Sequence, residues 1–323
     1  MLKVQGMEGL PPRVQQPVVS IGAYDGVHLG HQKILSRAVE EARRRGTAAA
    51  LVSFSPHPQK VIAPDTAPPL LQTPQQREEF IAELGIDFLV EVPFTRHLSQ
   101  LSPRQFVEQV LMRRPVSQVH VGFNFRFGHR RRGDVETLRQ LGRENGFQVF
   151  AVDPVTLRGQ RISSSKIRTL LGGGNVQRAR RYLGRPYEIH GTIVQGDQRG
   201  RTIGFPTLNI DSVNELLPAQ GVYVGRAVLE GSRYGCVTNI GYRPTVHPDY
   251  QGRPLVESHL FDFQEEVYGL PVNLQFCCRL REEKRFDGLK SLTEQIKKDS
   301  RRALRYLRQV EARERGRHHE NQP

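Results

Sequence analysis

The first half of the chain alternates short apolar runs with longer segments whose apolar residues recur at helical spacing. The apolar runs predict strands at Val18–Ile21, Ala48–Phe54, Phe88–Val92, Gln118–Val121 and Phe147–Val152. The amphipathic segments predict helices at Gln32–Arg45, Thr73–Leu84, Pro103–Met112 and Asp134–Asn145. Strands that recur with helices between them are typical of a parallel sheet covered on both faces. We therefore expect an α/β domain whose ligands bind beyond the carboxyl ends of its strands.

The pattern changes in the second half. Two further helical segments, Lys166–Leu171 and Val176–Leu183, precede Gly184-Arg185-Pro186, which indicates a hinge between domains. Short β-rich segments punctuated by Gly and Pro then predict an antiparallel barrel, at Tyr187–Val194, Thr207–Ile210, Gly221–Leu229, Gly235–Ile240, Leu255–Phe263 and Val272–Leu280. The spacing of leucine and isoleucine over Leu289–Val310 predicts a C-terminal amphipathic helix. We expect domains at 1–184 and 185–310, followed by a disordered polar tail at 311–323.

Composition limits the class of protein. With 323 residues and 37% hydrophobic content, the chain can bury two ordinary cores. The three cysteines, Cys236, Cys277 and Cys278, have neither C-x-x-C spacing nor a plausible disulfide framework, which suits a reducing cytosol and contains no metal signal. No apolar run approaches the length of a membrane span, and the N-terminus lacks the pattern of a signal peptide. We expect a cytoplasmic protein with no membrane partner.

The charge balance leaves two interpretations open. The net charge is +14, from 47 basic and 33 acidic residues, and arginine dominates the basic set. Such a balance fits either nucleic acid or small anionic substrates such as ATP. The arginines are scattered and no aromatic-interleaved strand surface accompanies them, so a solvated basic surface accounts for them better. We expect no specific nucleic-acid partner and see no sign of a required protein partner.

Glycine and histidine residues are concentrated directly after the first predicted strand. The segment Gly22-Ala23-Tyr24-Asp25-Gly26-Val27-His28-Leu29-Gly30-His31 joins that strand to the following helix. A tight turn into a helix N-terminus presents free backbone N–H groups and the positive end of the helix dipole, which together favour an anion. His28 and His31 lie at this point and can donate to phosphoryl oxygens. The alternative is a capped turn with surface histidines, although one glycine would suffice for that.

Three further segments of the first half suit a nucleotide site. Phe54-Ser55-Pro56-His57-Pro58 is a stiff loop able to bound a planar ligand, or a rigid surface turn. The segment 122–128 contains Asn124, three aromatic residues and an arginine, which suits a ring system and a phosphate; the alternative is a core-packing loop. The segment 161–168 brings three serine hydroxyls into a helix start between two arginines, which can hold phosphates, whereas an ordinary N-cap would use one hydroxyl.

These segments resemble the adenylyltransferase half of the bacterial bifunctional riboflavin kinase/FMN adenylyltransferase (FAD synthetase) family. The turn resembles the G-x-F-D-G-V-H-x-G-H signature of the nucleotidyltransferase superfamily, with Tyr24 in place of phenylalanine, and the serine segment resembles I-S-S-T-x-I-R, with Ser165 in place of threonine. The resemblance implies a Rossmann-like domain in which the FMN phosphate attacks ATP, with His28 and His31 acting in adenylyl transfer. It implies further ATP contacts from Gly22, Asn124, Arg161, Ser163, Ser164 and Arg168, and flavin contacts from Pro56, Pro58 and Phe127.

The second half has chemistry of its own. The segment Gly196–Ile210 contains three glycines and an arginine pair, which favour a flexible loop around phosphates. Thr207 and Asn209 alternate along the predicted strand and so face one side, where both can bind Mg²⁺ through oxygen; a plain hairpin would not need that pair. The segment 239–245 predicts a turn rich in hydrogen-bonding groups. Glu257 starts a further predicted strand segment and, taken alone, is more typical of a surface residue.

This half resembles riboflavin kinase. The matching residues are G-F-P-T-x-N at 204–209, E-x-H-L-x-D-F at 257–263 and Y-G at 268–269. The resemblance implies a riboflavin-kinase-like barrel in which Glu257 is the catalytic base that takes the proton from the 5′-hydroxyl of riboflavin. It implies ATP contacts from Gly196, Gly204, Pro206, Thr207 and Asn209, with Thr207 and Asn209 holding Mg²⁺.

The two halves together predict one enzyme with two activities. We expect riboflavin and ATP to give FMN, and FMN and ATP to give FAD, with ATP as co-substrate and Mg²⁺ as cofactor. One alternative is that one half is degenerate, which would leave a monofunctional kinase or adenylyltransferase. The other is a basic nucleic-acid-binding or regulatory protein, which the charge alone suggests.

Overall fold

The chain folds into an α/β unit and a β-barrel unit. The computed structural model describes residues 1–196, 204–242 and 254–320, the last eight of these by their backbone alone. The units are Met1–Ser164 and Ser165–Pro323. Because their positions relative to each other are not determined, each is described by itself.

The first unit is built on a six-stranded parallel sheet with the strand order β1-β4-β3-β2-β5-β6. Its strands are β1 (Leu2–Gln5), β2 (Val18–Ile21), β3 (Ala49–Ser55), β4 (Phe88–Pro93), β5 (Gln118–Gly122) and β6 (Gln148–Val152). The five strands expected from apolar runs are confirmed within a residue of their bounds. The edge strand β1 is missing from that expectation because most of its side chains are exposed, so it has no apolar run.

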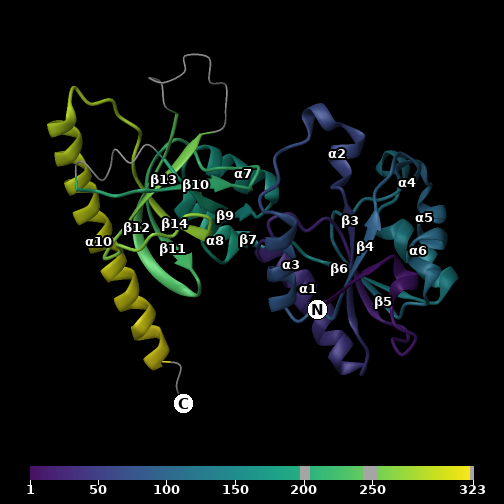
Figure 1. Cartoon of the computed structure of the whole chain (residues 1–323). Helices are drawn as coiled ribbons and strands as arrows, with labels where there is room; N and C mark the ends of the chain where they lie inside the picture. The colour runs from purple at the N-terminus through teal and green to yellow at the C-terminus, as the bar shows by residue number, and fades with distance from the viewer. Residues whose placement is uncertain (197–203, 243–253, 321–323) are drawn as a thin grey trace. The chain divides into compact units, whose positions relative to one another are not determined.

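Helices cover both faces of this sheet (Figure 1). The longer ones are α1 (Leu29–Arg44), α3 (Pro74–Glu83), α5 (Pro103–Gln109) and α6 (Val135–Asn145). Shorter turns of helix are η1 (Met7–Gly9), α2 (Pro58–Ile62), η2 (Pro64–Thr66), α4 (Arg96–Gln100), η3 (Leu111–Arg113) and η4 (His129–Arg131). The expected helices are present, and three of them start at side-chain caps, Thr73, Ser102 and Asp134.

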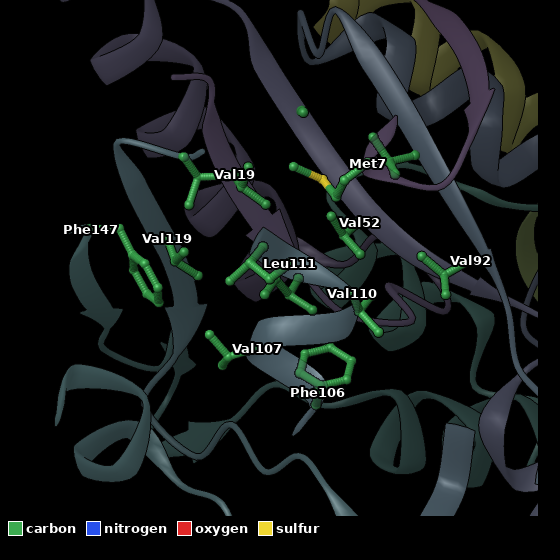
Figure 2. Close-up of a cluster of buried hydrophobic side chains, with 14 of the residues drawn as sticks. Met7, Val19, Val52, Val92, Phe106, Val107, Val110, Leu111, Val119 and Phe147 are labelled. Carbon is green, nitrogen blue, oxygen red and sulfur yellow. The ribbon is translucent and has the colours of Figure 1, made fainter. Parts of the chain in front are cut away.

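Alternate residues of each strand supply the two cores of this unit. Val18 and Leu51 pack with apolar residues of α1 and α3 on one face of the sheet. Val19 and Val52 point to the other face, where they join side chains of α5 and α6. Figure 2 shows this second cluster, in which Phe106 and Val107 of α5 lie with Val110, Leu111 and Phe147. Buried strands of this kind explain why the runs in the sequence are almost continuously apolar.

The order of the strands fixes where a ligand can enter. From β2 the chain proceeds through β3 and β4 in one direction along the sheet, and β5 and β6 then follow on the other side of β2. β2 and β5 are therefore neighbours at which the direction reverses. The loops beyond the carboxyl ends of two such strands frame the usual crevice for a ligand in an open α/β sheet.

The second unit contains a closed antiparallel barrel with the order β10-β13-β12-β11-β14-β9. Its strands are β9 (Tyr187–Val194), β10 (Leu208–Ser212), β11 (Gly221–Leu229), β12 (Ser232–Gly241), β13 (Leu255–Leu260) and β14 (Pro271–Arg281). The final helix α10 (Leu289–Glu320) packs on β11, β12 and β14, and its Ala303 and Leu307 are buried against the barrel. The expected antiparallel barrel and C-terminal helix are confirmed.

The bounds of the units differ from those expected. α7 (Ser164–Gly172) and α8 (Val176–Leu183) fall almost wholly in the second unit, and α8 packs against β14 and β9, so the division lies before 184. The two-stranded β7 (Thr156–Leu157) and β8 (Gln160–Arg161) precede them. α10 also continues to Glu320 through residues for which disorder was expected, because glutamate, alanine and arginine favour a helix.

A buried ion pair joins α10 to the end of β14. Nε of Arg281 lies 2.8 Å from Oδ2 of Asp299, and only 13% and 2% of the two side chains are exposed. Gln295 donates to the other carboxylate oxygen of Asp299 at 3.0 Å. Since breaking a buried pair leaves an uncompensated charge, this contact fixes the segment that follows β14 against the helix.

Two candidate nucleotide sites

The glycine–histidine turn follows β2, at the point where the strand order of the first unit reverses. His28 is the N-cap residue of α1. Nδ1 of His28 accepts a hydrogen bond from the backbone N–H of His31 at 3.2 Å, and the two imidazole rings are stacked with centroids 3.6 Å apart. Both rings thus lie at the positive end of the α1 dipole, where an anionic phosphate is favoured.

Three other segments hold this turn in place. The carboxylate of Asp25 is buried and accepts a hydrogen bond from the backbone N–H of Leu71 at 2.9 Å. The hydroxyl of Ser164 donates to the backbone oxygen of Asp25 at 2.8 Å. Nη1 of Arg77 donates to the backbone oxygen of Ala23 at 3.2 Å. Burial lowers the pKa of Arg77, although nearby carboxylates partly offset this by raising it. Asp25 is therefore a structural carboxylate. The hydroxyl of Ser164, which was expected to contact the phosphates, is hydrogen-bonded to the backbone of the turn.

Tyr24, which stands where the signature has phenylalanine, orients the ring of His31. Its hydroxyl is hydrogen-bonded to Ser20, whose own hydroxyl donates to the backbone oxygen of His120 at 2.8 Å. Burial raises the pKa of Tyr24, so the group stays protonated. The tyrosine ring meets His31 edge to face, with centroids 4.9 Å apart. A hydroxyl fixed by the sheet thus anchors an aromatic contact to the histidine.

Gly22 is required by this arrangement. A Cβ atom at position 22 would lie 2.9 Å from Cε2 and 3.2 Å from Cδ2 of Tyr24. We expect Gly22→Ala to displace the tyrosine ring and, through it, His31, so that FAD formation from FMN falls roughly 10- to 100-fold. Steady-state rates with FMN and ATP measure the effect. FMN formation from riboflavin by the same variant is the control, and an unchanged FAD rate would contradict the role.

The loop after β5 follows the strand that pairs with β2. Asn124 is exposed just beyond the carboxyl end of β5. The guanidinium carbon of Arg161 on β8 lies 4.5 Å from the ring centroid of Phe123, which is 40% exposed. Phe127, expected to contact the flavin, is instead buried in the core and stacked on Phe125. Phe123 is thus the accessible aromatic ring of this loop, a position that the sequence alone did not single out.

The remaining expected residues of this half lie on separate elements. Pro56 and Pro58 follow β3, the neighbour of β2, and Pro58 is the first residue of α2. Ser163 immediately precedes α7. Arg168 is on α7 in the second unit, so the structure does not place it relative to the turn.

The second site lies on the outer face of the barrel. Asn209 of β10 is paired in register with Glu257 of β13, and Glu257 is paired in register with Asn239 of β12. Val256 and Ser258, the neighbours of Glu257, are buried inside the barrel, so Glu257 projects outward. Side chains directly opposite on adjacent strands lie close together. The three polar residues therefore form a continuous row across three strands.

Glycine leaves room for Asn209 at one end of this row. A Cβ atom at Gly196 would lie 2.0 Å from Nδ2 of Asn209, so no larger residue fits while the amide keeps its place. Thr207 was expected to alternate with Asn209 along one strand, but β10 begins at Leu208 and Thr207 is the exposed residue before it. The segments 197–203 and 243–253, which carry the glycine–arginine loop and the end of the expected 239–245 turn, lie outside the described residues.

A histidine fixes the segment before β10. Nδ1 of His259 on β13 donates to the backbone oxygen of Pro206 at 2.8 Å, and its ring meets Phe205 edge to face at 5.3 Å. Gly204 has a positive φ of 80°, which allows the chain to turn into this segment. His259 belongs to the E-x-H-L-x-D-F motif, so the motif's spacing was the signal that could have revealed this role. Asn239 lies on β12 and not in the turn expected there.

The two halves of the chain match two different protein families. A family model described as FAD synthetase matches residues 11–166, and one described as riboflavin kinase matches residues 183–307. The bifunctional riboflavin kinase/FMN adenylyltransferase of Bacillus subtilis is 40% identical over 90% of this chain and 92% of its own length. The chain belongs to the bifunctional riboflavin kinase/FMN adenylyltransferase family.

Other members of this family give the same result. The enzymes of the same description from Pseudomonas fluorescens and Escherichia coli K12 are 37% and 35% identical, each over 93% of this chain and 96% of their own length. The chain therefore has both activities of the family, a riboflavin kinase and an FMN adenylyltransferase that use ATP.

The fold is shared with solved structures. A crystal structure described as a macrolide-efflux protein from Streptococcus pneumoniae superimposes with a TM-score of 0.84 and 27% identity, over 93% of this chain and 98% of that one. Within the described residues of this chain, none of the helices combines the length and apolar character that crossing a membrane requires.

Proposed function

We propose that the two activities use two separate sites, one on the histidine turn and one on the polar row of the barrel. The observation that carries this division concerns carboxylates. Glu257 projects from the barrel in register with Asn209, whereas Asp25 in the histidine turn is buried and bonded to Leu71. The barrel site thus offers a base, and the turn offers donors for an anion.

At the histidine turn the attacking group needs no activation. A phosphate oxygen of FMN attacks the α-phosphorus of ATP, the bond from that phosphorus to the β-phosphate bridge breaks, and pyrophosphate leaves with the electron pair. His28 and His31 donate to the phosphoryl oxygens, with further ATP contacts from Gly22, Asn124, Arg161 and Ser163, while Ser164 holds the backbone of the turn. Catalysis there consists of positioning and charge stabilisation. Pro56 and Pro58 bound the flavin, whereas Phe127 lies in the core and stacks on Phe125.

At the barrel the attacking group is a neutral hydroxyl and needs a base. Glu257 takes the proton from the 5′-hydroxyl of riboflavin as the oxygen attacks the γ-phosphorus of ATP, and ADP leaves with the electron pair of the broken bond. Gly196, Gly204 and Pro206 shape the segment that receives ATP.

The residues beside Glu257 suit Mg²⁺. The hydroxyl of Thr207 and the amide oxygen of Asn209 are the oxygen donors that this ion prefers, and Mg²⁺ in nucleotide sites takes only one or two protein ligands besides phosphates and water. The space that Gly196 leaves for the amide of Asn209 supports this assignment. When bound, the ion neutralises charge on the phosphates.

A single incubation tests the function. With riboflavin, ATP and Mg²⁺, chromatography is expected to show FMN first and FAD afterwards, and with FMN, ATP and Mg²⁺ it is expected to show FAD directly. EDTA in excess of Mg²⁺ should stop both reactions. FMN that accumulates without FAD, or FAD that forms only from added FMN, would show that one of the two sites is inactive and would contradict the proposal.

A further inference from the structure

The polar row on the barrel continues beyond Asn239 to a second carboxylate. Glu283 is an exposed residue two positions after the end of β14, and a hydrogen bond from the side chain of Asn239 lowers the pKa of its carboxylate. Asn239 is in turn in register with Glu257. The row therefore reads Asn209, Glu257, Asn239 and Glu283, contributed by three adjacent strands and the segment after a fourth.

A second glycine marks the far end of this row. A Cβ atom at Gly241 would lie 2.0 Å from Oε1 and 2.6 Å from Cδ of Glu283. Gly241 is in β12, two residues from Asn239, and has no positive φ that would require glycine. The carboxylate of Glu283 occupies the space that a side chain at position 241 would take, as the amide of Asn209 does at Gly196.

Several neighbouring groups act on the pKa of the exposed Glu283 side chain. Partial burial of the carboxylate raises the pKa of Glu283, the hydrogen bond from Asn239 and the charge of Arg281 oppose that rise, and the charge of Glu257 adds to it. Arg281 is itself bonded to the buried Asp299 of α10, which fixes the backbone two residues before Glu283. The segment is thus anchored to the helix while its carboxylate faces the row.

We propose that Glu283 is a positioning residue of the kinase site, which fixes the side chain of Asn239 beside Glu257 through a hydrogen bond. A free asparagine amide can present either its oxygen or its nitrogen to a neighbour. Donation of an N–H to Glu283 selects one of the two orientations, and so determines which group faces the adjacent strand. This inference rests on the proposed role of Glu257 as the base.

The experiment measures both activities of the full-length chain in parallel. Glu283→Ala is expected to lower the kcat of FMN formation roughly 10- to 100-fold, the usual cost of removing a residue that orients a catalytic group, with little change in the KM for ATP. FAD formation from supplied FMN should be unchanged. Glu283→Gln should recover most of the kcat, because its amide oxygen still accepts the N–H of Asn239.

Three comparisons make the test specific to this hydrogen bond. Gly241→Ala should slow FMN formation like Glu283→Ala, because its methyl group displaces the carboxylate. The double variant Asn239→Ala with Glu283→Ala should be no slower than the slower single variant, because both remove one interaction. Glu282→Gln, at an adjacent and exposed carboxylate, should behave as the unaltered protein.

The outcomes separate this inference from the proposed function. A kcat of FMN formation that is unchanged in Glu283→Ala, additive losses in the double variant, or no recovery in Glu283→Gln would overturn the positioning role. If Glu283→Ala fails to fold and loses both activities, Glu283→Gln and Gly241→Ala still decide. If Glu257→Gln retains FMN formation, the base assignment itself is wrong, whereas loss in Glu257→Gln with normal Glu283 variants refutes this inference alone.

Discussion

Glu257→Gln is expected to lower FMN formation from riboflavin roughly 10²- to 10⁴-fold, while FAD formation from supplied FMN remains near its normal rate. Glutamine has the shape of glutamate and can still accept a hydrogen bond, but it cannot take the proton of the 5′-hydroxyl. The loss therefore reports the contribution of general base catalysis. Because the FMN phosphate is already an anion, adenylyl transfer has no use for this carboxylate.

The measurement is a pair of steady-state assays on one preparation, one started with riboflavin and one with FMN. Glu294→Gln, which changes an exposed carboxylate on α10, is the matched control and should keep both rates. Equal losses of both activities in Glu257→Gln would mean that the residue supports the fold and not the phosphorylation step.

His31→Ala is expected to impair FAD formation and to leave FMN formation intact, the reverse of Glu257→Gln. Removing one donor to the transferring phosphoryl group should lower FAD formation roughly 10²- to 10³-fold. The backbone N–H that His28 accepts remains in place, and alanine is a strong helix former, so α1 and its N-cap should persist. FMN formation should be unaffected.

The control for this variant is His97→Ala, at an exposed histidine on α4. It should leave both rates unchanged. A His31→Ala enzyme that converts FMN to FAD at a normal rate would remove the imidazole from the mechanism, and the turn would then act through its backbone N–H groups alone.

The sequence predicted the elements whose causes are local. Val18–Ile21 and Gly221–Leu229 were predicted with the bounds that the structure has, because an apolar run or an alternation is contained within the segment itself. Thr73 and Asp134 begin two of the predicted helices, and in the structure each caps the first turn of the helix that follows it.

Contacts between segments that are distant in the chain could not be predicted from the sequence. Nothing near Asp25 in the chain indicates that Ser164 bonds its backbone oxygen, and the register that places Asn239 opposite Glu257 is fixed by the pairing of two strands. Phe127 and Phe123 belong to one motif, yet only their packing decides that the first is buried and the second accessible. The sequence therefore predicted which segments carry the two proposed sites, and only the structure shows how these segments contact one another.

The ion pair between Arg281 and Asp299 sets a limit on how far the chain can be shortened from its C-terminal end. A truncation before residue 299 would leave the buried guanidinium of Arg281, two positions from Glu283, without its carboxylate partner. Riboflavin phosphorylation should therefore decline before the truncation reaches the barrel itself. Protein engineers who trim this helix to improve expression would impair the flavin-phosphorylating half first.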